Sequence, residues 1–235
     1  MTQKKNTQGY CNPVTVAKFI DALNNAKKAV QFGDDIRVRF SGGNSKMGEI
    51  PSISTLPILS CPDICRDTCG IRCYAAKLAN LRPNVRNAYA HNMAMAIYKP
   101  IEYWRQINDF VKAQRFFRFH VSGDIMGNAY FHHMIDIANN NPHCNILCFT
   151  KRYEVVNEWI DNNGNLPDNL HILFSGWQGL TPENPHNLPE TNVYTCNDDF
   201  NPDWKTCGGN CFNCACRGLG CWQANAGDII AFKMH

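Results

Sequence analysis

Apolar residues recur with helical spacing near the start of the chain and again after residue 73. The first of these segments follows Asn12-Pro13, a pair typical of a helix start. Pro100 separates the last two. The pattern therefore predicts helices over 14–30, Tyr74–Ala79, Val85–Tyr98 and Ile101–Ala113.

Shorter apolar or alternating runs have the length of strands. Two more helical segments, Asn128–Asn139 and Glu154–Asp161, stand between some of these runs. Strands that alternate with helices are typical of βαβ units and a parallel sheet, and an open sheet and a partial barrel fit this pattern equally well. The strands are predicted at Ile36–Phe40, Phe116–Val121, Asn145–Thr150, His171–Ser175, Val193–Thr195 and Ile229–Phe232.

Composition excludes several classes of protein. Hydrophobic residues make up 44% and charged residues 18% of the 235 residues, which is ordinary for a folded chain and unlike a disordered one. A net charge of +3 gives no indication of nucleic-acid binding. No stretch has the roughly 20 apolar residues of a membrane span, and the first residues lack the apolar core of a signal peptide. We therefore expect a cytoplasmic protein with no membrane partner.

The thirteen cysteines change this picture. In a reducing compartment, clustered cysteines indicate metal binding or catalysis and not a disulfide framework. Two windows of the chain contain most of them. Cys144 and Cys148 flank an apolar run and are interpreted as small buried residues, and Cys11 stands apart from both windows.

The first window has a cysteine at every fourth position. Short spacings allow one looping backbone to bring several thiolates to a single iron–sulfur cluster. In a continuous helix the sulfurs would spread along a stripe too long for one cluster, so the segment must bend, which Pro62 and Gly70 permit. A structural zinc site and a redox-active thiol group are the alternatives. The predicted ligands are Cys61, Cys65, Cys69 and Cys73.

The second window contains five cysteines in fifteen residues, with Cys196 upstream. Its glycines allow the backbone to wrap closely around a bound group. Four ligands are needed, so one or two of these six thiols are spare. Zinc is a stronger alternative here, because Cys-x-x-Cys pairs with glycine are common in zinc ribbons. We select Cys207, Cys211, Cys214 and Cys221, with Cys196 and Cys216 as further candidates.

The order of these elements resembles the radical S-adenosylmethionine superfamily. A strand and cysteine loop are followed by helices and then by the strand that leads into Ser122-Gly123-Asp124. The resemblance implies a partial parallel (β/α)6 barrel over residues 1–195, with a cysteine-rich lobe and a last strand over 196–235 that is similar to auxiliary-cluster extensions. It also implies that the Ser122-Gly123-Asp124 turn binds the methionyl amine of S-adenosylmethionine.

The chain also resembles a family of bacteriophage gene products, and this likeness covers most of its length. Four segments carry it: Gly43-Asn44-Ser45-Lys46-Met47-Gly48, Cys73-Tyr74-Ala75, Arg118-x-His120-x-Ser122-Gly123-Asp124 and Thr150-Lys151-Arg152. If the chain is encoded by a phage, the cytoplasm in question is that of the host.

Strand ends supply further candidate residues, because ligands of such sheets bind at the carboxyl ends of the strands. A carboxylate there can orient an amine, and cationic side chains can hold a carboxylate or phosphate. An internal salt-bridge network among the same residues is the alternative. The candidates for cofactor or ligand binding are Lys46, His120, Ser122, Gly123, Asp124, Lys151 and Arg152, and Ser175 and Trp177 follow the next strand.

Three functional hypotheses follow from these patterns and from the resemblance to the radical S-adenosylmethionine superfamily, which alone implies the first. In the first, the protein is a radical-SAM-like oxidoreductase or transferase with one or two [4Fe-4S] clusters, the first of which reduces S-adenosylmethionine to a carbon radical that abstracts hydrogen from a substrate. In the second, a fourth thiolate closes the cluster, since the first window departs from the superfamily's three-then-two spacing. The protein then transfers electrons or binds a partner. In the third, both windows bind zinc as a scaffold.

Overall fold

The computed structural model describes residues 9–33, 35–195 and 200–234. The chain divides into two compact units, each assembled from separate stretches of sequence. The first unit consists of Met1–Arg39, Ser54–Gln106 and Val121–Asp124, and the second of Phe40–Ile53, Ile107–His120 and Ile125–His235.

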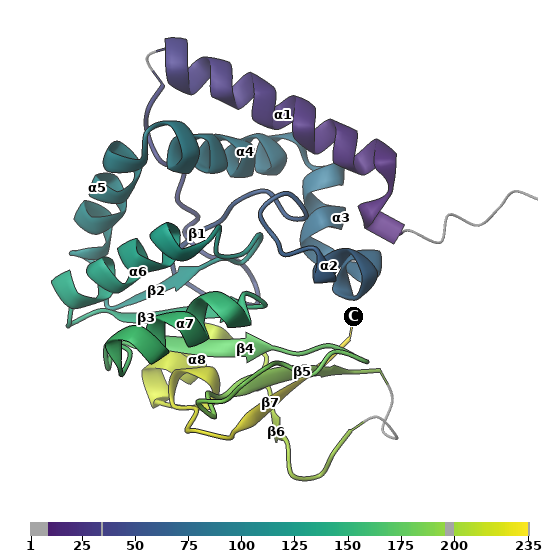
Figure 1. The fold of residues 1–235 in the computed structure, drawn as a ribbon, viewed down its shortest axis with the longest axis vertical. Coiled ribbons are helices and arrows are strands. Elements are labelled where there is room, and N and C mark those ends of the chain that lie inside the picture. Colours follow the sequence, from purple (N-terminus) through teal and green to yellow (C-terminus); the bar gives the residue numbers. More distant parts are fainter. Residues whose placement is uncertain (1–8, 34, 196–199, 235) are drawn as a thin grey trace, which may run out of the picture. The chain divides into compact units, whose positions relative to one another are not determined.

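The first unit is helical. Helix α1 (Pro13–Phe32) packs along α4 (Pro83–Tyr98), as Figure 1 shows. The Asn12 side chain caps α1 by accepting a hydrogen bond from the Thr15 amide at 2.9 Å, which satisfies an amide that the helix leaves unpaired. Phe19 is fully buried. The predicted helix over 14–30 is thus confirmed.

Shorter helices complete this unit. The helices predicted at Tyr74–Ala79 and Val85–Tyr98 are present with slightly longer bounds, and the one predicted at Ile101–Ala113 is present over most of its length. The elements are η1 (Gly9–Cys11), α2 (Ile64–Asp67), η2 (Cys69–Arg72), α3 (Tyr74–Leu81) and α5 (Pro100–Val111), whose last residues belong to the second unit.

The strand predicted at Ile36–Phe40 is wrong. This segment is extended but pairs with side chains and not with another strand. Asn92 accepts from the Arg39 amide at 2.8 Å and donates to the Arg39 carbonyl at 2.9 Å, and Gln106 accepts from the Val38 amide at 2.9 Å. The alternating pattern predicted extended backbone correctly, but helix side chains satisfy the polar groups that a sheet would otherwise pair.

The second unit is built on one parallel sheet of seven strands, in the order β1-β2-β3-β4-β5-β7-β6 (Figure 1). The sheet is open, with β1 and β6 at its edges, so the predicted barrel is not confirmed. The strands are β1 (Ser52–Ile53), β2 (Phe116–Phe119), β3 (Asn145–Thr150), β4 (Leu170–Ser175), β5 (Glu190–Tyr194), β6 (Lys205–Thr206) and β7 (Ile229–Lys233).

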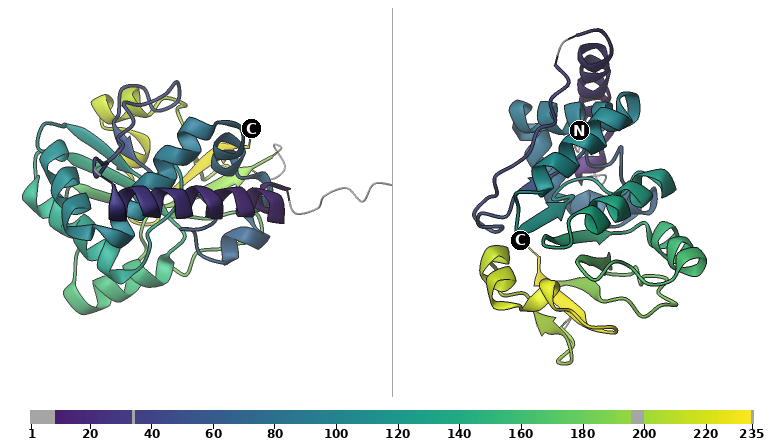
Figure 2. Two further views of the ribbon diagram at one scale, coloured as in Figure 1. Left: turned by 90° about the horizontal axis from the view of Figure 1, so that it is seen from above. Right: turned by 90° about the vertical axis from the view of Figure 1, so that its left-hand side faces the viewer.

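Helices cover both faces of this sheet. Figure 2 shows α6 (Asn128–Asn140) and α7 (Tyr153–Asn163) on one side and α8 (Cys211–Arg217) on the other. Strand β2 is accordingly buried on both faces, as parallel strands under two helical layers are. Its Phe117 packs edge-on against Phe119 on one face, while Phe116 on the other face contacts Trp222 of η4 (Gly220–Trp222).

Four elements of the second unit, β1, β6, α8 and η4, have no counterpart in the sequence prediction. Strand β6 is only two residues long, and α8 passes through the second cysteine window. The glycines of this window are expected only to let the backbone wrap closely around a bound group. The Asn210 side chain nevertheless begins α8 by accepting from the Asn213 amide at 2.9 Å.

Within the described parts of the chain, no helix combines the length and the apolar character that crossing a membrane requires.

Candidate metal centres

The first cysteine window bends as its spacing predicts. The one-turn helix α2 ends at Asp67, and the 3₁₀ helix η2 begins at Cys69. Between them Thr68 has φ −112° and ψ −103°, outside both helical conformations, so the chain changes direction there. The four sulfurs are therefore not spread along a single helical stripe.

The thiols of this window lie close together in the first unit. Cys65 is buried, and hydrogen bonds with the thiols of Cys61 and Cys69, together with burial, raise the pKa of its thiol. Burial raises the pKa of Cys73 to about 12, although the Ala76 amide donates to its sulfur at 3.4 Å and opposes this shift. Without metal the thiols of Cys65 and Cys73 are therefore protonated at neutral pH, so metal binding at these two residues would release protons.

Cys11 joins this group, which sequence reasoning missed. A Cβ atom added to Gly70 would lie 2.3 Å from the Cys11 sulfur, so only glycine allows the thiol to approach this closely. Burial and then negative charge at Cys69 and Cys61 raise the pKa of Cys11. Cys11 and Cys61 are 50 positions apart in the sequence, so spacing within a window could not reveal the contact. We call Cys11, Cys61, Cys65, Cys69 and Cys73 the first thiol group.

The Ser122-Gly123-Asp124 turn is in the same unit, and the turn and Val121 before it are hydrogen-bonded to the two residues that border the cysteine window. The Asp124 amide donates to the Ser60 hydroxyl at 3.3 Å, directly before Cys61. The Tyr74 hydroxyl, directly after Cys73, donates to the Val121 carbonyl. Ser122 donates its hydroxyl to the Thr55 carbonyl at 3.0 Å.

Gly123 is required in this turn. Its φ is +82°, and an added Cβ atom would lie 2.1 Å from the Thr55 hydroxyl oxygen and 2.5 Å from that of Ser60. Ser122 and Asp124 are 3% and 4% exposed, so the turn is a buried feature of the molecule. The structure thus places the predicted turn next to the predicted cysteine loop.

The second cysteine window forms a separate thiol group in the second unit. Helix α8 carries Cys211 and Cys214 one turn apart, while Cys207 precedes it and Cys221 follows it. Burial raises the pKa of Cys221 to about 12, and negative charge at the other three thiols adds to this shift. Burial likewise raises the pKa of Cys211 and Cys214. We call Cys207, Cys211, Cys214 and Cys221 the second thiol group.

Arg118 of β2 faces the second thiol group, and sequence reasoning did not connect the two. The side chain is 8% exposed, lies over the Phe149 ring at 4.4 Å, and donates to the Met47 sulfur at 3.1 Å. Its positive charge and a hydrogen bond to Cys211 oppose the rise in that thiol's pKa. Its Nε is buried and has no hydrogen-bond partner among the described residues. A buried positive charge is costly unless a negative charge compensates it, so Arg118 would be stabilised by thiolates, or by a metal cluster that thiolates bind.

The remaining predicted cysteines lie elsewhere. Cys216 points outward from α8 and is exposed, while Cys144 and Cys148 are fully buried in the second unit, as their apolar surroundings predict. Cys196 is outside the described residues. The twelve described cysteines are free thiols, with no disulfide between them.

Of the other polar candidates, His120, Lys151, Arg152 and Lys46 belong to the second unit. His120 directly follows β2 with φ +58° and is 4% exposed, with its ring 5.4 Å from that of Tyr130. A left-handed backbone at a buried non-glycine residue is uncommon and occurs at functional positions. The strand predicted at Phe116–Val121 therefore ends at Phe119, and Arg118 and His120 do not share a regular strand face.

Lys151 and Arg152 follow β3. Lys151 is 7% exposed, and its ammonium donates to the Ser175 hydroxyl at 2.6 Å. Arg152 donates to the Ile125 carbonyl at 3.1 Å and pairs with Glu154 at 3.6 Å. Trp177 is half-buried beyond β4, in an isolated bridge with Leu180. These contacts position the side chains at the carboxyl ends of β3 and β4.

The two thiol groups fit a sulfur-ligated metal in their chemistry. Thiolates are the ligands of iron–sulfur clusters and of structural zinc. Within the part of the chain that the structure describes, however, no group of three or more His, Cys, Asp or Glu side chains is arranged so that it could hold a metal ion. The thiols are thus neighbours but do not form a finished coordination shell.

Comparison with known proteins gives one match. The family model described as Gene product 88 matches residues 17–195, which is well over half of the chain. This confirms the predicted resemblance to a phage gene-product family. The match includes the whole first cysteine window and ends before the second. No curated protein and no solved structure matches the chain.

Proposed function

The chain belongs to the Gene product 88 family, and we propose that it is an iron–sulfur protein with one cluster at each thiol group. The observation that carries the proposal is the contact of the Cys65 thiol with both Cys61 and Cys69. Three sulfurs from one short loop, with Cys73 and Cys11 beside them, supply the soft ligands that such clusters require.

We further propose that the first cluster is ligated by thiolates alone. Five thiols are available where four suffice, and the structure brings Cys61 to the other cysteines of its window. A cluster ligated in this way supplies one-electron transfer. The protein's own contribution is burial, which excludes water, and amide groups such as that of Ala76, which donate to the ligand sulfur. Electron transfer to a partner is then the activity.

The second thiol group supports the same proposal independently. Cys211 and Cys221 lie near the buried guanidinium of Arg118, which would offset the negative charge of a thiolate-ligated cluster. A zinc ion bound by four thiolates is also negatively charged, so Arg118 would stabilise either centre. Which metal is bound therefore decides between an iron–sulfur cluster and zinc.

The test is anaerobic purification followed by iron, sulfide and zinc counts. We expect a brown protein with about four iron and four sulfide per thiol group. Cys221→Ser should remove the iron of the second centre, whereas Cys216→Ser is the matched control, because it changes an exposed thiol of the same window. A colourless protein with stoichiometric zinc, or equal iron loss in both variants, would contradict the proposal.

A second candidate is radical chemistry on S-adenosylmethionine. One observation favours it: the Ser122-Gly123-Asp124 turn is bonded to Ser60 and lies near Tyr74, the residues that border the cysteine window. In the resembling superfamily this turn binds the methionyl amine, and such binding needs an iron without a fourth protein ligand.

Adding S-adenosylmethionine to the reduced protein separates the two candidates. If all ligands of the first cluster are thiolates, its electron paramagnetic resonance spectrum should not change. A changed spectrum, together with full cluster retention in Cys61→Ala, would favour an open iron held by Cys65, Cys69 and Cys73. Cys61→Ala that loses the cluster would favour the closed centre.

A further inference from the structure

Helix α3 carries a stripe of apolar side chains that face outward. Tyr74, Leu78 and Leu81 are spaced four and three residues apart, which places them on one face of the helix. They are 62%, 41% and 64% exposed, whereas the three alanines of the opposite face are buried. Helix α3 contacts α1 and α4 (Figure 1), so its buried face attaches it to the first unit and the stripe stays open. We call Tyr74, Leu78 and Leu81 the α3 stripe.

The α3 stripe begins beside the first thiol group. Cys73 is the N-cap residue of α3, and its sulfur accepts a hydrogen bond from a backbone amide of the first turn. Tyr74 follows directly, and its side chain is held in place because its hydroxyl donates to the Val121 carbonyl. At the other end of the helix, the Arg86 guanidinium donates to the Ala79 carbonyl at 3.0 Å. The stripe is therefore fixed at both ends next to the proposed first centre.

Positive charge borders the α3 stripe. Lys77 is exposed at its edge, and Arg82 is exposed directly after the helix. Neither of them forms an ion pair with another described residue. Lys18 of α1 adds a third cation, since its ammonium donates to the Asn80 side chain at 3.0 Å. The chain contains no Asp or Glu over 68–101. This surface is thus complementary to an acidic partner.

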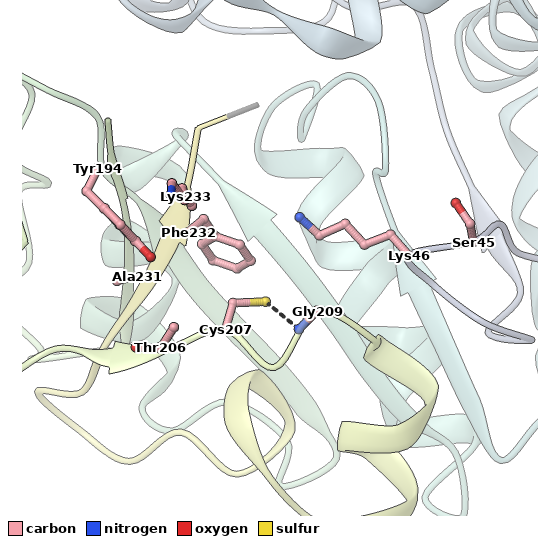
Figure 3. A pocket seen from close by; sticks show the side chains of 9 residues that line it. All are labelled: Ser45, Lys46, Tyr194, Thr206, Cys207, Gly209, Ala231, Phe232 and Lys233. Atoms are coloured by element: carbon pink, nitrogen blue, oxygen red, sulfur yellow. Dashed lines mark hydrogen bonds between the residues drawn. The ribbon is translucent and has the colours of Figure 1, made fainter. Parts of the chain in front are cut away.

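The second thiol group has no comparable surface. Lys46, whose carbonyl accepts from the Cys211 amide at 2.9 Å, directs its ammonium toward the half-buried Phe232 ring, 5.3 Å from the ring centroid (Figure 3). Among the large apolar residues over 200–234, Leu219 alone is exposed. Single exposed apolar residues are ordinary, whereas a contiguous patch marks an interaction surface. The patch is therefore a feature of the first thiol group.

We propose that the α3 stripe is the docking surface for a small acidic electron-carrier protein. One electron passes from the reduced carrier to the oxidised first cluster, so the carrier is oxidised as the cluster is reduced. The inference rests on the proposed function, because a cluster ligated only by thiolates transfers electrons and needs a partner that comes close to it. The small size of the stripe fits such a partner, since encounters between electron-transfer proteins bury little area.

A membrane surface is another occupant for a helix face that is apolar and basic. The geometry of α3 favours a protein. The helix has only eight residues, and its buried face is attached to the first unit. Three apolar side chains therefore offer little area for insertion into a bilayer, whereas they suffice for a brief encounter that opposite charges steer.

Titration calorimetry with oxidised flavodoxin, a small acidic electron carrier, tests the docking on the full-length, anaerobically purified protein. We expect saturable binding that weakens as ionic strength is raised. Leu81→Gln should weaken binding about 10-fold, and Lys77→Gln about 3-fold with a smaller dependence on salt. The matched controls are Ile101→Gln and Lys112→Gln, because both residues are exposed and lie outside α3.

Rapid mixing with reduced flavodoxin tests the electron transfer. Visible absorption of the first cluster should bleach, and it should bleach more slowly in Leu81→Gln than in Ile101→Gln. Bound flavodoxin that passes no electron would overturn the proposal. The thermal midpoint of all four variants should equal that of the wild type, because each one replaces an exposed side chain by a polar one.

The remaining outcomes separate this inference from the proposed function. A protein purified without iron would contradict the proposed function and the docking inference with it. An iron-loaded protein that does not bind flavodoxin at low ionic strength would overturn the docking inference alone, and so would equal binding by Leu81→Gln and Ile101→Gln. Binding to vesicles of anionic phospholipid that Leu81→Gln abolishes, without flavodoxin binding, would assign the α3 stripe to a membrane.

Discussion

Two single residues, Cys11 and Arg118, tie the thiol groups to the rest of the fold. Cys11 approaches Gly70, and its pKa responds to charge at Cys61 and Cys69. Arg118 contributes a buried positive charge at Cys211 and Cys221. Neither residue is part of a cysteine window. Substituting either one therefore tests whether the metal centres depend on residues outside the windows.

For Cys11, we expect Cys11→Ala to make iron loss from the first centre about 10-fold faster, the scale of effects from groups beside a metal ligand. The reason is that removal of this thiol exposes the side of Gly70 to water and chelator. The measurement is the rate of iron transfer to a chelator under anaerobic conditions, with Cys216→Ala as the control. An unchanged rate would show that Cys11 has no part in the centre.

For Arg118, we expect Arg118→Met to lower the midpoint potential of the second cluster. The guanidinium stabilises added negative charge, and a loss of about 1.4 kcal/mol corresponds to roughly 60 mV for one electron. A redox titration followed by visible absorption measures the shift. Arg118→Lys keeps the charge and should shift the potential less. Equal potentials in all three proteins would separate Arg118 from the cluster.

At the scale of elements, the turn at residues 122–124 and the extended segment at residues 36–39 are held by hydrogen bonds that involve side chains, where a regular strand would use backbone hydrogen bonds alone. The Ser122-Gly123-Asp124 turn is bonded to the segment that leads into the first cysteine window. The segment at residues 36–39 is bonded to side chains of α4 and α5. Both arrangements depend on a small number of specific contacts and are therefore sensitive to single substitutions.

For the turn, we expect Gly123→Ala to lower the free energy of unfolding by about 2–4 kcal/mol. The added methyl group meets both backbone strain at φ +82° and the hydroxyl groups of Thr55 and Ser60. Gly164→Ala isolates the strain, because Gly164 has φ +86° with nothing within 4 Å of an added Cβ atom. Chemical denaturation measures both. Equal losses would mean that the close approach to Ser60 is unimportant.

His91 contacts the extended segment at residues 36–39 and makes the stability of the folded protein depend on pH. Burial lowers the pKa of His91, whose Nε2 lies 2.9 Å from the Arg37 carbonyl oxygen. The unfolded state therefore binds a proton more readily than the folded state, so this contribution to stability is present above pH 6.5 and is lost as pH falls through the folded pKa.

His91→Gln keeps a hydrogen-bond donor at this position but does not titrate. We expect the thermal midpoint of the variant to fall less than that of the wild type between pH 7 and pH 5. Thermal unfolding followed by circular dichroism at several pH values is the measurement. Parallel curves for the two proteins would exclude His91 as a source of acid sensitivity.

At the scale of the whole molecule, the two thiol groups belong to different compact units. Each unit contains all the thiols of its own group, and no thiol is shared between the groups. The two centres should therefore assemble independently of one another.

We expect Cys65→Ser to remove the iron of the first centre and leave that of the second, and Cys221→Ser to do the reverse. Each variant should retain about half of the iron and sulfide of the wild type. Complete loss in either variant would show that the centres assemble together. The matched control is Cys148→Ala, because this buried cysteine lies outside both groups.

Local pattern was sufficient for most elements. The bounds of α1, α6, β3 and β7 differ by only a few residues from those predicted, because helical or strand periodicity and helix-start residues are local signals. The selection of Cys207, Cys211, Cys214 and Cys221 as ligands, with Cys196 and Cys216 as further candidates, stays a prediction.

Tertiary structure alone decided the rest. Whether an extended segment pairs with a strand or with side chains, as at Val38 and Arg39, depends on which polar groups packing brings near it. The same holds for Cys11 and for Arg118. Sequence determined the secondary structure and the chemistry available, since both are local, whereas contacts between distant residues exist only once the chain has folded.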